Sequence, residues 1–498
     1  MTGDTINHLV RTVVLIGLLS WFSIALVRGL MHDERQGGFG RVTMGAGPEP
    51  GVRVLITNRP AEVRDYGQPL RTWERLDIAV LQPVEVVTPS FPDQDEHRLT
   101  VRAGSYLRIE PDGTDGMVLS SPEWGKQHNW AVSVVRVVPR STRPEATATP
   151  DFDPRSGVDA SHPALRDPSS YEAADGGAVF ALPSTYRYRG QIEVVWNSPK
   201  DLVAINCLPT EAYVEGVVAV EMPPSYPLEA LKAQAIASRG VAFAKRIENL
   251  HRKQGKPLPF DLMDSLNDQE YRGAGIGNAM VLRAVQSTRG LITAVDGVPF
   301  APLFCASSGG STEAIDNVLP GAKDALGRTS LSTMMLPQRD DQCLPAAQAL
   351  GQMNSHWTTT EVLKSDELRS RLANFFKAKD LQVGHINQIR VAERDARSTR
   401  VKTVEIWHTM GDPLRISGHD FRMLMGPSRI RSTLWSDDSP RKIDTADRKK
   451  AYQITCYGFG HGVGMSQISA WQLATDGMAA AAILQRFYGP RLELVQKW

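Results

Sequence analysis

The chain has 498 residues, of which 42% are hydrophobic and 22% are charged, and its formal net charge is +1. This length allows two or three domains with a sizeable core, and the composition is that of an ordinary globular protein. Because lysine and arginine form no basic run and no stripe interleaved with aromatic side chains, we expect no nucleic-acid partner.

The N-terminal residues contain one hydrophobic segment. The run from Thr12 to Val27 carries no charge and is flanked by Arg11 and Arg28. Its length lies between that of a signal-peptide core and that of a full membrane span. We therefore expect residues 1–31 to act as an uncleaved signal anchor or as a cleaved signal peptide, and a buried helix is the third alternative. Either of the first two would place the rest of the chain outside the cytoplasm, anchored to the membrane or secreted.

A tether, a β-rich region and a linker are expected next. Residues 32–50 are polar and rich in glycine, as a tether would be. Residues 51–140 contain runs of β-branched side chains separated by Pro, Gly and Asp, which predict strands from Val52–Ile56 to Ala131–Val138. Residues 141–185 are rich in Pro, Ser, Ala and Asp with little periodicity, which indicates a linker or a long surface insertion.

Residues 186–498 alternate strand and helix patterns, which predicts a mixed helix/strand domain and hence an α+β fold with a β-rich N-terminal region. The elements expected from this pattern are a hairpin at Tyr188–Trp196 and Leu202–Leu208, helices at about Thr210–Val220 and Leu228–Glu248, strands at Gly290–Ala294, Phe300–Phe304 and Thr399–Trp407, a mostly helical stretch at 330–385, and a helical end at Gln467–Tyr488 that is broken at Asp476-Gly477.

Glu221 is the candidate general acid. We expect Thr210 to cap its helix and Pro223 to help end it. Glu221 follows three valines of one apolar helix face at the i+7 position, and it lies at the helix C-terminus. Partial desolvation and the helix dipole both favour the neutral acid there, and a protonated carboxyl group can donate a proton to a leaving oxygen. From the pattern alone, a solvated helix-end residue is the alternative.

The following helix supplies three polar residues that are candidates for substrate contacts: Lys232, Gln234 and Arg239. From the pattern alone they form a solvated face. Alanines recur along the same helix, which suggests that it packs tightly against a neighbour.

A glycine-rich loop surrounds His461. Glycine occupies every second position on both sides of this histidine, at Gly458, Gly460, Gly462 and Gly464. Glycine permits positive φ and a close approach of the backbone to a ligand. The spacing matches neither a dinucleotide-binding nor a P-loop motif. We expect His461 to bind or orient a substrate rather than act as the primary acid, because its ordinary pKa leaves it mostly neutral at pH 7. A structural histidine is the alternative.

Polar residues near this loop complete the expected substrate-binding set. Ser466 and Gln467 begin the final helix, while Ser307 and Ser308 belong to a similar Ser-Ser-Gly-Gly turn. We expect all four to line one groove with His461, on the wall that faces the candidate acid.

Four cysteines, Cys207, Cys305, Cys343 and Cys456, form no CxxC pair, which argues against a zinc ribbon or a redox pair. Disulfides and buried free thiols both remain open.

Together these motifs resemble the stage II sporulation protein D / amidase-enhancer family (the SpoIID/LytB domain). The resemblance runs from Tyr188 to Gly489. It rests on Tyr213-x-x-Gly-Val-Val-x-x-Glu-Met-Pro, Glu229-Ala-Leu-Lys-Ala-Gln-Ala, Gln269-Glu-Tyr-Arg-Gly273, Ser307-Ser-Gly-Gly-x-Thr-Glu313, Gly418-His-Asp-Phe-Arg422 and Gly460-His-Gly-Val-Gly-Met-Ser-Gln467.

The resemblance implies that residues 186–498 form a glycan-cleaving domain with a central cleft. In that family the glutamate before Met-Pro is the acid/base of a lytic transglycosylase, and here it is Glu221. The implied reaction cleaves the MurNAc-GlcNAc bond of peptidoglycan and leaves a 1,6-anhydroMurNAc end. Sporulation members prefer glycan stripped of stem peptides, which implies a cell-wall amidase as partner. The alternative is a non-catalytic peptidoglycan-binding activator of such an amidase.

One departure from the family concerns metal. Some members carry a Cys…His-Cys zinc cluster just before the Gln-x-Tyr segment, where this chain has Met263, Asn267 and Asp268. Because methionine and asparagine are poor zinc ligands, we predict no structural zinc, and no cofactor is implied.

Overall fold

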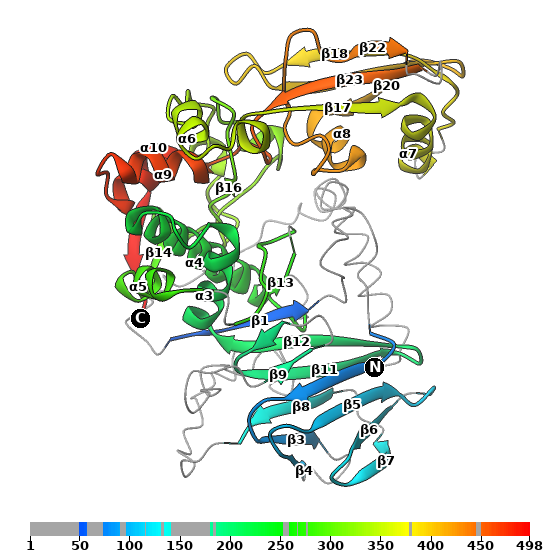
Figure 1. The fold of residues 1–498 in the computed structure, drawn as a ribbon, viewed down its shortest axis with the longest axis vertical. Coiled ribbons are helices and arrows are strands. Elements are labelled where there is room, and N and C mark those ends of the chain that lie inside the picture. The colour runs from blue at the N-terminus through cyan, green and yellow to red at the C-terminus, as the bar shows by residue number, and fades with distance from the viewer. Residues whose placement is uncertain are drawn as a thin grey trace, which may run out of the picture. The chain divides into compact units, whose positions relative to one another are not determined.

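The computed structural model of the chain describes residues 49–56, 73–89, 96–114, 116–130, 134–140, 180–182, 186–251, 258–265, 267–274, 277–377, 381–444 and 450–498 (Figure 1). The expected signal segment, the tether before residue 49 and most of the expected linker lie outside these residues. In the part of the chain that is described, no helix is long and apolar enough to cross a membrane.

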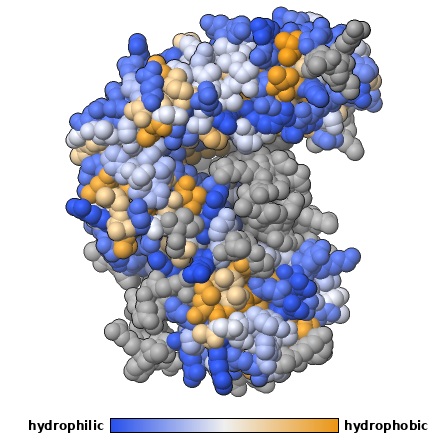
Figure 2. Space-filling model, viewed as in Figure 1, coloured by the Kyte–Doolittle hydropathy of each residue, from blue (hydrophilic) through white to orange (hydrophobic). Residues whose placement is uncertain are grey.

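The described residues form two compact units, and their mixture of helices and several sheets confirms the α+β class. The first unit runs to Ala301 and also includes Leu494–Trp498, while the second runs from Pro302 to Glu493. The boundary between the units thus falls inside the range 186–498. Figure 2 shows that hydrophilic residues cover most of the visible face, and hydrophobic residues gather in separate patches.

A seven-stranded sheet joins the β-rich region to the chain that follows it. Its order is β13 (Leu262–Met263), β1 (Gly51–Ile56), β12 (Asp201–Pro209), β11 (Gln191–Ser198), β8 (Val134–Pro139), β3 (Val84–Pro89) and β4 (Glu96–Val101). The predicted hairpin is confirmed, because β11 and β12 pair antiparallel. The β-rich region is not separate from this hairpin, since β1 pairs with β12 and β8 pairs with β11.

A second sheet of the first unit has the order β10 (Arg187–Tyr188), β9 (Phe180–Ala181), β2 (Leu76–Val80), β5 (Tyr106–Pro111), β6 (Met117–Ser121) and β7 (Gly125–Trp130). A smaller sheet contains β15 (Val298–Pro299), β14 (Leu291–Val295) and β25 (Glu493–Gln496). The strand predicted at Gly290–Ala294 is therefore confirmed as β14.

Three helices of the first unit pack together: α3 (Thr210–Glu221), α4 (Leu228–Leu250) and α5 (Ala279–Ser287). The predicted ranges of α3 and α4 are confirmed within two residues. The predicted cap of α3 is wrong. Pro209 occupies the N-cap position, and the hydroxyl of Thr210 donates instead to the carbonyl of Pro50 at 2.6 Å. The carboxylate of Glu49 accepts the hydrogen bond from the free backbone N–H of Glu211 at 2.8 Å.

The second unit contains the glycine-rich loop and the C-terminal helices. Strand β16 (Phe304–Cys305) pairs in parallel with β24 (Met465–Ser466). Helix α6 (Cys343–Ala349) packs on α9 (Gln467–Thr475), which is followed by α10 (Ala480–Tyr488). The predicted break of the final helix at Asp476 is confirmed. The strand predicted at Phe300–Phe304 is wrong except for its last residue.

The remainder of the second unit holds two sheets and two helices. One sheet contains β17 (Thr358–Lys364), β23 (Lys450–Tyr457), β21 (Leu434–Trp435) and β22 (Arg441–Asp444), and the other has the order β18 (Ile386–Arg394), β19 (Val401–His408) and β20 (Leu414–Ser417). The range 330–385 is not mostly helical, because β17 interrupts it before α7 (Ser365–Lys377). Strand β17 pairs with β23 along its whole length. Its threonines and Val362 are β-branched, which favours a strand.

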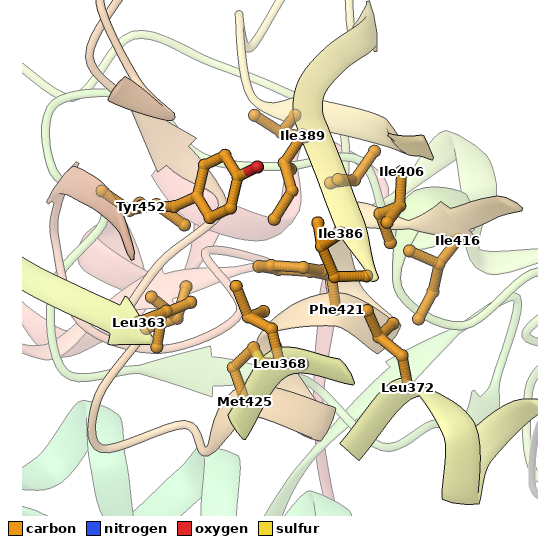
Figure 3. Packing of buried hydrophobic residues seen from close by; sticks show 14 of the residues in the cluster. Leu363, Leu368, Leu372, Ile386, Ile389, Ile406, Ile416, Phe421, Met425 and Tyr452 are labelled. Atoms are coloured by element: carbon orange, nitrogen blue, oxygen red, sulfur yellow. The ribbon is translucent and has the colours of Figure 1, made fainter. Parts of the chain in front are cut away.

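An apolar core holds this part of the second unit together (Figure 3). Leu363 of β17, Leu368 and Leu372 of α7, and Phe421 of α8 (Gly418–Met425) are buried together with Ile406 of β19. The inward faces of β18, β19 and β20 are thereby covered. All four cysteines are buried and free in this structure, which agrees with the alternative of buried thiols.

Candidate active site at the end of helix α3

Glu221 is the last residue of α3 and is half-buried. The helix ends there because Met222 adopts an extended conformation, with φ −126° and ψ 140°, ahead of Pro223 and Pro224. The backbone N–H of Glu270 donates a hydrogen bond to Oε1 of Glu221 at 2.8 Å. This bond fixes the direction of the carboxyl group, while partial exposure leaves the residue accessible to solvent.

The turn after Glu221 is held in place from both sides. The side chain of Met222 is fully buried and that of Tyr226 is nearly so. Asn278 caps α5 by accepting hydrogen bonds from the first backbone N–H groups of that helix, and its amide also donates to the carbonyl of Pro224 at 3.2 Å. The helix end that carries the candidate acid is therefore tied to α5.

The segment that supplies the Glu270 N–H is anchored by its two neighbours. Gln269 is buried, and its amide donates to the hydroxyl of Tyr213 and to the carbonyl of Ser238, both at 3.2 Å. The hydroxyl of Tyr271 donates to Asn206 of β12 at 2.8 Å. The rings of Tyr213 and Tyr271 pack with centroids 5.1 Å apart. Backbone geometry at residue 270 is thus set by contacts with α3, α4 and β12.

Two glycines make this anchoring possible. A Cβ on Gly216 of α3 would lie 2.5 Å from the carbonyl oxygen of Gly273 and 2.7 Å from Cε2 of Tyr271. Gly273 itself has φ +77°, and a Cβ there would lie 2.0 Å from the carbonyl oxygen of Arg187. Glycine at both positions lets the 269–273 segment lie directly against the helix.

The nearby phenols do not act as acids at neutral pH. Burial raises the pKa of Tyr213 and of Tyr271 well above the ordinary value. Both hydroxyl groups stay neutral, so their contribution is to position the segment beside Glu221.

Helix α4 packs against its neighbours through buried alanines, as its sequence suggested: Ala230, Ala233, Ala235 and Ala237. Its polar residues differ in their surroundings. Lys232 is half-buried and forms an ion pair with Glu229 at 2.7 Å. Gln234 is fully buried and donates to Ser238 at 2.9 Å.

Arg239 contacts other parts of the protein rather than solvent. It is fully buried, its guanidinium group pairs with Glu211 at 2.7 Å, and it donates to the carbonyl of Leu291 at 3.0 Å. This network joins α3, α4 and β14. Neither Gln234 nor Arg239 is exposed to a ligand in this structure.

The glycine-rich loop of the second unit packs against other segments of the same unit, among them those of Gly309 and Arg400. Each of its four glycines has a positive φ. A Cβ on Gly458 would lie 2.7 Å from the backbone nitrogen of Gly309, and a Cβ on Gly462 would lie 2.3 Å from Cζ of Arg400. The alternating glycines therefore serve close packing between protein segments, and the expected close approach to a ligand does not explain them.

The two loops predicted to lie together do so. Ser307 and Phe459 exchange two backbone hydrogen bonds, each of 2.9 Å. However, Ser307, Ser308, Ser466 and Gln467 are all buried, so they do not line an open groove in this structure. The serines join a network centred on Asp340, whose Oδ2 accepts hydrogen bonds from Ser308 at 2.6 Å and from Ser469 at 2.7 Å.

Two residues that organise these loops were missed by the sequence analysis. Arg400 is fully buried and donates to the carbonyl oxygen of Ser311 and to the hydroxyl of Ser432. Burial raises the pKa of Asp340, although its serine partners lower it. No signal in the local sequence distinguishes either residue, because their partners lie far away along the chain.

These observations can be compared with known proteins. The Stage II sporulation protein family (SpoIID) matches residues 198–294, which include Glu221 and Gln269–Gly273, and a domain of unknown function (DUF8618) matches residues 330–464. An uncharacterised protein of Brachyspira hyodysenteriae is 30% identical over 318 residues, covering 64% of this chain and 74% of that protein. The chain belongs to the SpoIID family.

Two Bacillus proteins are more distantly similar to this SpoIID protein. The amidase enhancer of Bacillus subtilis is 27% identical over 299 residues, which cover 55% of this chain and 39% of that protein. The stage II sporulation protein D of Bacillus amyloliquefaciens is 26% identical over 297 residues, which cover 57% of this chain and 74% of that protein.

His461 of this SpoIID protein is a neutral histidine. Its Nδ1 accepts a hydrogen bond from the backbone N–H of Val463 at 3.0 Å. Although the residue as a whole is half-buried, burial of its ring lowers the pKa to about 3, and the charges of Arg422 and Arg400 add to this effect. His461 belongs to the second unit and Glu221 to the first, so their expected meeting in a single groove stays a prediction.

The segment that carries zinc in some relatives has other contacts here. The carboxylate of Asp268 accepts a hydrogen bond from the backbone N–H of Met263 at 2.8 Å and forms an ion pair with Lys245 at 3.3 Å. No group of three or more His, Cys, Asp or Glu side chains within the described ranges could hold a metal ion. That the protein contains no zinc stays a prediction for metal analysis.

Proposed function

We propose that this SpoIID protein is a peptidoglycan lytic transglycosylase in which Glu221 is the acid/base. The observation that carries the proposal is the placement of this carboxyl group. It is half-buried at the negative end of α3, and the N–H of Glu270 fixes its direction. A carboxyl group whose direction is fixed in this way can be presented to one atom of a bound substrate for proton transfer.

The proposed reaction uses one carboxyl group twice. Glu221 first donates its proton to the glycosidic oxygen as the bond from C1 of MurNAc to the GlcNAc oxygen breaks. The resulting carboxylate then takes the proton from the C6 hydroxyl of the same MurNAc, whose oxygen bonds to C1 and closes the 1,6-anhydro ring. Glu221 is thereby reprotonated. Because the nucleophile belongs to the substrate, no second carboxylate is needed to activate water, unlike in hydrolytic glycosidases.

We further propose that the substrate is glycan stripped of its stem peptides. This would make the protein act after an amidase, outside the cytoplasm, through a signal anchor or cleaved signal within residues 1–31. Similarity to proteins named amidase enhancer and stage II sporulation protein D supports a place in cell-wall remodelling.

A second function is favoured by one of these names. The 27% identity to an amidase enhancer supports a non-catalytic role in which the protein binds peptidoglycan and activates an amidase. Glycan cleavage by the isolated protein separates the two proposals, because an activator alone releases no anhydro-ended fragments.

The test is digestion of purified glycan, with and without stem peptides, followed by mass spectrometry of the products. The intact protein should release 1,6-anhydroMurNAc ends, mainly from stripped glycan, whereas Glu221→Gln should lower the rate by about 10²–10⁴-fold, the usual contribution of one positioned acid. Glu248→Gln is a matched control, because Glu248 is a partly exposed carboxylate on α4 and its ion pair with Lys245 is long, at 3.9 Å.

Full activity in a folded Glu221→Gln protein would remove Glu221 from the mechanism. Absence of anhydro products from the intact protein, together with stimulation of an amidase, would favour the activator role.

A further inference from the structure

The outward face of the sheet formed by β18, β19 and β20 carries an ordered row of charged side chains. In the antiparallel register, Arg390 of β18 and Arg415 of β20 both lie opposite Glu405 of β19. The inward face of the same sheet packs on the apolar core (Figure 3). Side chains of adjacent strands at paired positions lie on the same face, so the row Arg390–Glu405–Arg415 faces away from that core.

Glu405 holds this row together. Its carboxylate forms ion pairs with both arginines, at 3.0 Å with Arg415, and it accepts a hydrogen bond from the indole N–H of Trp407 at 3.0 Å. The side chain of Glu405 is only 4% exposed, whereas those of Arg390 and Arg415 are 53% and 70% exposed. The Glu405 carboxylate therefore positions three side chains that reach solvent, those of Arg390, Trp407 and Arg415.

Trp407 is the large apolar member of this group. It is 41% exposed, and the guanidinium carbon of Arg390 lies 5.5 Å from the centre of its ring. With its N–H bonded to Glu405, the indole is fixed in orientation before any ligand binds. We call Arg390, Glu405, Trp407 and Arg415 the β19 platform.

The platform is continuous with a groove along strand β18. The groove is lined by Gln388, Arg390, Glu393 and Arg394 of β18 together with Asp437 and Asp438. Gln388 pairs directly with Trp407 across the two strands. A linear ligand could therefore cover the indole with one unit and place the next units in the groove.

We propose that the β19 platform and this groove bind a saccharide chain that carries carboxylate groups, as a secondary glycan-binding site outside the reacting site. A fixed, partly exposed indole offers a flat apolar surface to the C–H face of a sugar ring. Planar amide, guanidinium and carboxylate groups around it suit ring hydroxyls. At the platform two guanidinium groups share one carboxylate, so positive charge remains there for a carboxylate of the ligand. The acidic side chains of the groove, Glu393, Asp437 and Asp438, can accept hydrogen bonds from ring hydroxyls.

The choice of ligand rests on the proposed function. Removal of stem peptides from peptidoglycan leaves a free lactyl carboxylate on each MurNAc, which matches the charge of the platform. The platform lies within residues 330–464, the part that matches a domain of unknown function. A separate binding site here would keep the protein on a long polymer while Glu221 acts on one bond.

The test measures binding by the full chain carrying Glu221→Gln, so that no glycan is cleaved during titration. The probes are soluble stripped glycan fragments and a neutral chito-oligosaccharide of similar length. Trp407→Ala should weaken binding of both by about five- to thirtyfold, as expected for truncation of an interface aromatic that contributes about 1–2 kcal/mol. Arg415→Gln should weaken binding of the carboxylate-bearing glycan alone.

Tyr106→Ala is the matched control, because Tyr106 of β5 is an aromatic residue of similar exposure, 47%, in the first unit. It should leave both affinities unchanged. Trp407→Tyr keeps an aromatic face, so its affinity for both ligands should stay within a few-fold of the parent's. If Trp407→Ala fails to fold, Trp407→Tyr and Arg415→Gln together test whether the platform binds glycan.

Three results would overturn the proposal: no glycan binding by the parent, unchanged binding in a folded Trp407→Ala variant, or equally tight, Trp407-dependent binding of polyaspartate or a single-stranded oligonucleotide. Because binding is measured without turnover, loss of this proposal is distinguishable from failure of the cleavage experiment.

Discussion

Gly216 is the position where packing and the candidate active site are most directly connected. The substitution Gly216→Ala adds a methyl group that would lie 2.5 Å from the backbone oxygen of Gly273 and 2.7 Å from the ring of Tyr271. Both contacts are far shorter than the optimal carbon separation of about 3.5–4.0 Å. Because the first obstacle is backbone on an anchored segment, the 269–273 segment must move away from α3.

The magnitude follows from two opposing effects. Alanine improves the intrinsic helix propensity at this interior helical position by about 1 kcal/mol. Forcing an extra carbon into a packed site costs about 1–3 kcal/mol, and the rigid obstacle places this site toward the upper end. We expect a net loss of about 1–2 kcal/mol, which lowers the melting temperature of a unit of this size by about 2–8 °C.

The same displacement should reduce activity more than stability. The moving segment carries the N–H that orients the Glu221 carboxyl group, and a misplacement of about 1 Å in a catalytic group costs on the order of 10²-fold in rate. Thermal unfolding and release of anhydro products from stripped glycan measure the two effects. Gly277→Ala is the control, because a Cβ there meets its neighbours at 3.4–3.6 Å, which is ordinary contact. Wild-type stability and activity in Gly216→Ala would refute this account of how the carboxyl group is positioned.

Two further predictions concern pH and location. The pKa of His461 falls to about 3 in the folded protein from an ordinary 6.5, so the unfolded state binds the proton first and stability should decline as pH drops from about 6.5 toward 3. Urea unfolding at pH 7 and pH 5 should therefore show a smaller decline in the free energy of unfolding for His461→Gln than for wild type. Equal declines would contradict the burial argument. Residues 1–31 should direct export, so a C-terminal reporter that works only in the cytoplasm should be silent, and an active reporter would rule out the signal.

Much of the local structure is predictable from sequence, because its causes are local. The alternation of β-branched residues predicts β11 and β12, and Pro223 and Pro224 fix the end of α3 at the candidate acid. Interruption at Asp476 separates α9 from α10 as expected. The motif spacing also indicates the family, since a set of separated motifs in order is specific without any knowledge of contacts.

The tertiary structure decided what those motifs do. Glu270 orients Glu221 across 49 positions of sequence, and Arg239 leaves the expected solvated face to pair with Glu211 across 28 positions. The alternating glycines around His461 indicate positive φ, but they do not tell whether a ligand or the guanidinium group of Arg400 lies against the backbone there. Arg400 directly precedes β19, far from the loop in the sequence. Such pairings depend on which distant segments the core brings together, and no local periodicity records that choice.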